Sequence, residues 1–192
     1  MFRLDNLLER WAGVYAPLAN ACGCGTSQNF FRIDRIGGDN AFARNFNTAP
    51  SPAMAVPTNI DAEMGDNPKQ VVYHHGIYIM VKQASAAANM PTTNHADERE
   101  ASDCKEDLDT IAQDLLAYLF HLRTRARGDA DIPGLTPEDR IAIKGFELEK
   151  AKWWTVPEMY NGWWVLGLEF DHVESRMLCI KEEKYTERTM LT

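Results

Sequence analysis

The sequence predicts an α+β protein in which an antiparallel or mixed sheet packs against one long helix and an N-terminal helix. Two segments, near residues 4–15 and 103–127, carry apolar residues at the i, i+3, i+4 spacing of amphipathic helices. Others, near residues 71–83 and 146–170, alternate with the period of two that is typical of strands. The length of 192 residues fits one domain, so we expect residues 1–192 to form a single folded unit.

The N-terminal segment is the first expected helix. Leu4, Leu7, Leu8 and Trp11 share one face, and acidic and basic side chains occupy the other. Pro17 marks its end, because proline interrupts a helix.

Three strands are expected before the long helix. Residues 29–36 alternate in polarity and a short strand is expected at 54–56. The clearest strand covers residues 71–83, where both faces are largely apolar. That pattern indicates a central position in the sheet.

The long helix is expected over residues 103–127. Ser102 or Asp103 can cap it, acidic residues fill its first turns, and Gly128 ends it. One apolar stripe runs along it, made of Leu108, Ile111, Leu115, Tyr118, Leu119 and Leu122. A second, short helix is expected to begin at Thr136-Pro137, since threonine caps helices and proline suits their first position.

The C-terminal part predicts two more strands. The alternating runs around residues 146–154 and 164–170 are separated by a short connection at 157–162, so they should pair as an antiparallel hairpin. A further strand could lie at 177–180, followed by a flexible tail at 181–192. Residues 37–70 lack a sustained periodicity and are expected to form a long irregular excursion.

The net charge and the composition limit the classes of partner that this protein can bind. Lys and Arg number 20 against 28 acids, and the resulting net charge of −8 repels a nucleic-acid backbone. Arg123, Arg125 and Arg127 are explained by the dipole at the end of the long helix. With no signal sequence or membrane span apparent, we expect a cytoplasmic protein whose four cysteines are reduced thiols.

No motif of catalysis or metal binding is complete in the sequence. Cys22 and Cys24 lack the second pair of ligands that a zinc site needs. His74 and His75 are neighbours on a strand, so they point to opposite faces. His95, beside acids at 97–100 and with Cys104 nearby, is the remaining candidate for a metal ligand or base, although an exposed charged cluster is more often solvated surface. We therefore expect no cofactor, no metal and no catalytic residues.

An aromatic cluster surrounds the expected hairpin connection and supplies the interface candidates. Tryptophan and tyrosine are enriched where proteins bury surface against one another. On each strand the two tryptophans of a pair face opposite ways, so one can enter the core while the other points outward. An equal alternative is that both faces of these strands are covered within the monomer, since a helix layer can cover one face of a sheet. The cluster consists of Trp153, Trp154, Tyr160, Trp163 and Trp164.

The order of elements resembles that of the tail-terminator family of long-tailed bacteriophages. The resemblance covers nearly the whole chain and rests on topology. It comprises an N-terminal helix, a strand with Phe30-Phe31, strands at 53–56 and 71–83, one long helix at 103–127 and a final strand pair ending at 164–170. The resemblance implies a protein that forms a ring on the end of a tail tube and joins it to the head.

From this resemblance we expect a self-associating structural protein of phage or prophage tail assembly, of the tail-terminator or head-tail joining type. Its partners would be further copies of itself and other tail or head-joining proteins, in the host cytoplasm or in the virion. Two alternatives stay open: a small metal-dependent enzyme built on His95 and Cys104, and a monomeric ligand-binding module with residues 37–70 as its lid.

Overall fold

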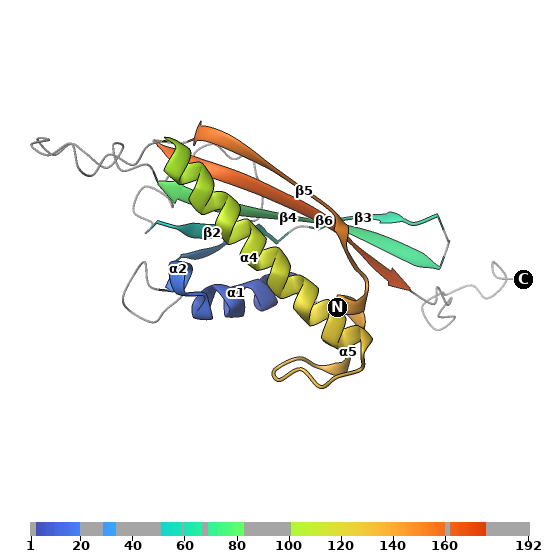
Figure 1. Cartoon of the computed structure of the whole chain (residues 1–192). Helices are drawn as coiled ribbons and strands as arrows, with labels where there is room; N and C mark the ends of the chain where they lie inside the picture. The colour runs from blue at the N-terminus through green and yellow to red at the C-terminus, as the bar shows by residue number, and fades with distance from the viewer. Residues whose placement is uncertain are drawn as a thin grey trace, which may run out of the picture.

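Helices cover one face of a six-stranded sheet in this protein (Figure 1). The computed structural model describes residues 3–19, 29–33, 51–58, 60–66, 69–82, 101–159 and 162–175. The α+β class expected from the sequence is therefore confirmed.

The sheet is mixed and its strands follow the order β1-β2-β4-β6-β5, with β3 pairing with β4 beside that path. β1 runs parallel to β2, and every other pairing is antiparallel. The strands are β1 (Phe30–Ile33), β2 (Ala53–Pro57), β3 (Asp61–Met64), β4 (Gln70–Lys82), β5 (Phe146–Met159) and β6 (Trp163–Ser175). Within the described ranges, β1 and β5 are therefore the terminal strands of the path.

β4 occupies the centre of the sheet, as its two apolar faces predicted. It pairs with β6 from Gln70↔Ser175 to Lys82↔Trp163 and with β2 and β3 on its other side. Every second side chain is buried against the helices, namely Tyr73, His75, Ile77, Ile79 and Val81.

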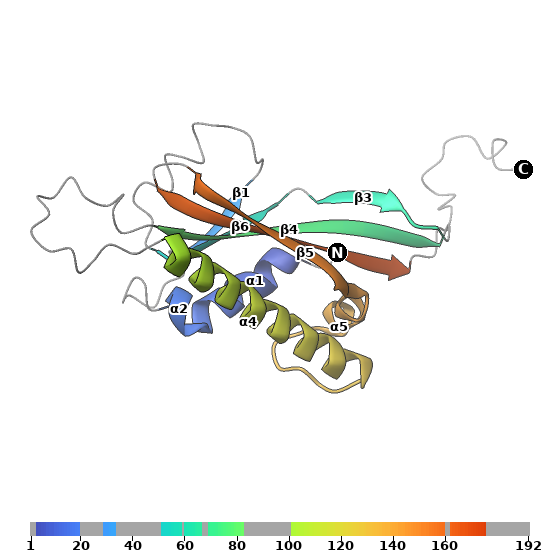
Figure 2. The same cartoon turned by 45° about the horizontal axis from the view of Figure 1, so that its top comes forward.

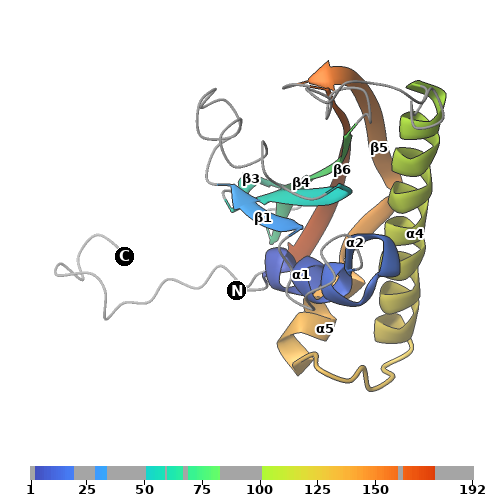
Figure 3. The same ribbon diagram turned by 90° about the vertical axis from the view of Figure 1, so that its left-hand side faces the viewer.

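The helices lie together on one face, which we call the helix face (Figures 2 and 3). α1 (Leu4–Val14) and the short α2 (Ala16–Ala19) lie near β1 and β2, whereas α4 (Ala101–Arg127) crosses β4, β6 and β5. α5 (Pro137–Lys144) packs between α4 and β6. The amphipathic stripes of α1 and α4 explain this arrangement, because each must bury its apolar side against the sheet.

Two apolar clusters divide the interior. The larger lies between the helices and the helix face and contains, among others, Leu8, Leu108, Leu115, Phe146 and Leu168. The smaller lies on the opposite face, which we call the outer face, and contains Ala53, Ala55, Met80, Trp163 and Val165.

The helix boundaries follow local chemistry. The Thr136 side chain accepts a hydrogen bond from the backbone N–H of Asp139, whose carboxylate accepts one from the Thr136 N–H. This reciprocal cap begins α5 as expected, with Pro137 in the first turn. α4 ends at Arg127, immediately before Gly128.

Two expectations need adjustment. The stretch 37–70 contains the short strand expected at 54–56, which is β2, and one further strand, β3, that was not expected. β3 was missed because its four residues, all exposed, carry no buried face to produce a hydrophobic signal. α4 begins at Ala101, ahead of the expected caps. Residues 37–50, the strand expected at 177–180 and the tail at 181–192 lie outside the described residues.

Candidate functional site

The strongest surface feature of the described residues lies on β5, the terminal strand on one side of the sheet. Among the described residues, β6 is the strand that pairs with β5. The register of β5 shifts twice, between Glu147 and Lys152 and between Val156 and Met159. The run Lys152–Val156 between these irregularities pairs residue by residue with β6, so it is a short regular edge that we call the β5 edge.

Trp153 and Trp154 stand on this edge and point to opposite faces of the sheet. Trp153 is paired with Leu168, a core residue, and therefore lies on the helix face. Trp154 is paired with Gly167 and lies on the outer face. They remain 48% and 41% exposed, so neither enters the core. The expectation that one member of each pair fills the core is wrong for this pair.

The Trp154 ring packs against β6 at Gly167, where there is no side chain to displace it. A Cβ atom added to Gly167 would lie 2.5 Å from Cζ2 of Trp154, which is closer than any real contact. The indole therefore rests directly on the backbone of β6. Glycine at this position therefore leaves room for the Trp154 ring, which remains 41% exposed.

The other pair is more enclosed. Trp163 is only 1% exposed and belongs to the outer-face cluster, with Lys82 Nζ 5.8 Å from its ring centroid. Trp164 is partly buried against the main core. A surface contact role for Trp163 is therefore wrong, because its side chain is already covered. Tyr160 lies outside the described residues.

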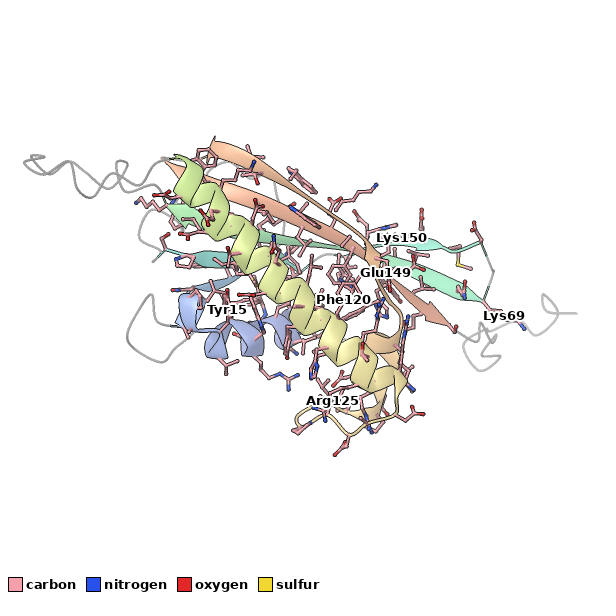
Figure 4. The ribbon with its side chains drawn as sticks, in the orientation of Figure 1. Tyr15, Lys69, Phe120, Arg125, Glu149 and Lys150 are labelled. Atoms are coloured by element: carbon pink, nitrogen blue, oxygen red, sulfur yellow. The ribbon has the colours of Figure 1, made fainter. Side chains whose placement is uncertain are left out.

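Glu149 and Lys150 lie in the irregular part of β5 (Figure 4). A buried arginine of α4 ties this part of the strand to the helix. Arg123 donates to the Phe146 carbonyl at 2.8 Å and to Glu149 Oε2 at 2.6 Å. The hydrogen bond from Arg123 lowers the pKa of Glu149 to about 2. Nearby, Lys150 Nζ lies 2.6 Å from Glu147. These ion pairs lie within the register shift between Glu147 and Lys152, just before the regular edge begins.

The two neighbouring histidines lie on opposite faces, as predicted. On the outer face His74 Nδ1 lies 2.7 Å from Asp171 and Nε2 lies 3.5 Å from Glu63. The hydrogen bond with Asp171 raises the pKa of His74. On the helix face His75 is buried, and its ring centroid is 5.3 Å from that of Phe170. Burial lowers the pKa of His75 to about 3.

Of the residues considered as metal ligands, only Cys104 and the two neighbouring histidines lie in the described part of the chain. Cys22, Cys24, His95 and the acids at 97–100 lie outside it. Cys104 is fully buried in the main core. Among the residues that the structure describes, no three His, Cys, Asp or Glu side chains form a group that could hold a metal ion. None of the described helices is both long enough and apolar enough to cross a bilayer.

Comparisons of the chain with protein-family models, with curated proteins and with solved structures found no match. The function must therefore be argued from the geometry of the chain itself.

Proposed function

We propose that this chain is a structural assembly protein that acts by self-association and carries out no catalysis. The observation that carries the proposal is the exposed tryptophan pair on a terminal strand, with one indole on each face of the sheet. In the context suggested by its order of elements, it serves phage or prophage tail assembly as a tail-terminator or head-tail joining protein.

Exposed tryptophans on an edge suit a contact surface for an energetic reason. A large, rigid ring buries much apolar area and loses little conformational freedom on binding, so tryptophans are frequent among the few residues that dominate an interface. Trp154 is already held against Gly167, which reduces the ordering cost further. An edge strand also offers unpaired backbone groups to a partner strand.

The element order supports the tail context. An N-terminal helix, a central strand, one long helix and a closing hairpin follow one another here in the sequence α1, β4, α4 and β5-β6. β3 and α5 are additions to that order. The proposed partners are further copies of this chain and other tail or head-joining proteins, in the host cytoplasm and then in the virion.

Sedimentation velocity over a range of concentrations tests self-association. The wild-type chain is expected to form a discrete oligomer, and Trp153→Lys is expected to shift it toward monomer, because a charge must then be desolvated at the contact. Ile141→Lys is the matched control: Ile141 is 64% exposed but lies on α5, away from the β5 edge. The same shift in both variants, or a wild-type monomer at high concentration, would contradict the proposal.

The tail context needs a separate test. The chain should co-purify with other tail or head proteins from cells in which the source phage or prophage is induced. A monomer that instead binds stoichiometric zinc or iron would favour the metal-dependent enzyme. A metal-free monomer would favour the ligand-binding module.

A further inference from the structure

Among the described residues, the terminal strands β1 and β5 run in opposite directions, and the β5 edge is about as long as β1. β1 runs parallel to β2, β2 antiparallel to β4, β4 antiparallel to β6, and β6 antiparallel to β5. β1 and β5 therefore point in opposite directions. β1 contains four residues, Phe30–Ile33, and the β5 edge is the comparably short run Lys152–Val156.

We infer that copies of this chain associate head to tail, with the β5 edge of one copy pairing antiparallel with β1 of the next. The inference rests on the proposed self-association and specifies its contact. Two copies related by a rotation that preserves strand direction would bring β5 beside a β1 of opposite direction, so the sheet would continue across the junction. Such a contact uses a different surface on each copy, which generates a ring where the rotation closes.

The side chains fit one register. Placing all of β1 against Lys152–Thr155 sets Phe31 opposite Trp154 and Ile33 opposite Lys152, all on the outer face. The pairs on the helix face are Arg32 with Trp153 and Phe30 with Thr155. No side chain changes face in this register.

Each face then gains a compatible contact. On the outer face, Phe31 and Ile33 already pack against the small apolar cluster, and Trp154 would extend that surface. On the helix face, Arg32 would stand beside the Trp153 indole, a favourable cation–aromatic neighbour. Arg32 is held in place by Asp5 at 2.8 Å and Glu9 at 2.7 Å, so the cation is positioned before any partner arrives.

The irregularities of β5 limit the contact to this run. The register shifts at Glu147/Lys152 and Val156/Met159 interrupt regular pairing at both ends, and bulges at an edge oppose further strand addition. The β5 edge can therefore pair regularly only with a short strand, of about the length of β1. A symmetric contact between two β5 edges would instead form a closed dimer, in which β1 takes no part.

Disulfide trapping tests the inference in the full chain. Ile33→Cys and Lys152→Cys change partly exposed or exposed residues, and opposed residues of an antiparallel pair lie within the Cα separation that a disulfide requires. Mixing the two single variants under mild oxidation should give at least about tenfold more linked dimer than either alone, because assembly raises the effective thiol concentration. Mass spectrometry of the digested product identifies the 33–152 link among the native cysteines.

Met64→Cys is the matched control, since Met64 is exposed on β3, away from the junction. It should not link to Ile33→Cys above the background. Self-linking of Lys152→Cys as strong as that in the mixture would overturn the inference in favour of a symmetric β5 contact. If the samples sediment as oligomers but the 33–152 link is absent, the edge pairing alone is overturned. If they sediment as monomers, the proposed function is overturned as well.

Discussion

Acidification is expected to destabilise the fold through His75, which is buried on the helix face of β4. Its ring centroid lies 5.7 Å from that of His172 and 5.3 Å from that of Phe170. No hydrogen-bond partner for its Nε2 atom occurs among the described residues. Burial, reinforced by the nearby His172, lowers the pKa of His75 from 6.5 to about 3. The folded protein therefore holds this imidazole neutral well below the pH at which the unfolded chain protonates it.

The size of the effect follows from that difference. Because the folded pKa is depressed, the full stability is present above the unfolded value and is lost as the pH falls from 6.5 toward 3. One pKa unit corresponds to about 1.4 kcal/mol, so the complete loss is on the order of 5 kcal/mol. Between about pH 7 and about pH 5 the expected loss is roughly 2 kcal/mol.

The assay compares the wild type with His75→Met, which replaces the titrating ring by an apolar side chain of similar size. Urea denaturation at both pH values gives the free energy of unfolding. The wild type should lose about 2 kcal/mol more than the variant on acidification, since other titrating groups change in both proteins alike. Equal pH dependence in the two proteins would refute the reasoning that burial keeps His75 neutral.

Two further predictions concern the outer face. Gly167→Ala should destabilise the protein by about 1–3 kcal/mol, because the new methyl group collides with the Trp154 ring. In a Trp154→Ala background the same change should cost much less, and an unchanged cost in this double-mutant cycle would argue against the contact. Asp171→Asn should lower the pKa of His74, measured by NMR titration, because Asp171 supplies the largest stabilisation of its protonated form. The stability that this pair contributes is present below the unfolded pKa and lost as the pH rises through the folded one, so a His74 pKa that does not move would contradict the pairing.

Periodicity predicted the elements that bury a face. The apolar stripe of α4 and the two apolar faces of β4 could be predicted, because elements that bury a face have apolar residues at regular intervals in the sequence. The hairpin β5-β6 and the cap at Thr136 were predicted for similarly local reasons. β3 was not, since its exposed residues obey no such repeat.

The details of the candidate site depended on long-range pairing that no local pattern encodes. Arg123 looked like an ordinary cation at a helix end, yet it is buried and holds Glu149 on β5. The exposure of Trp153 and Trp154, and the burial of Trp163, followed only once the strand order placed β5 at the edge and β6 inside. The glycine under Trp154 is a possible sequence signal, but only the register identifies its partner.

Hydrogen exchange along β5 tests the central claim, that copies of this chain meet at the β5 edge. The backbone amides of Lys152–Val156 that do not bond to β6 should exchange more slowly in concentrated wild-type protein than in Trp153→Lys at the same concentration. The amides of α5 should exchange equally in both. Equal rates on β5, in samples that sediment as oligomers, would contradict the account and place the contact elsewhere.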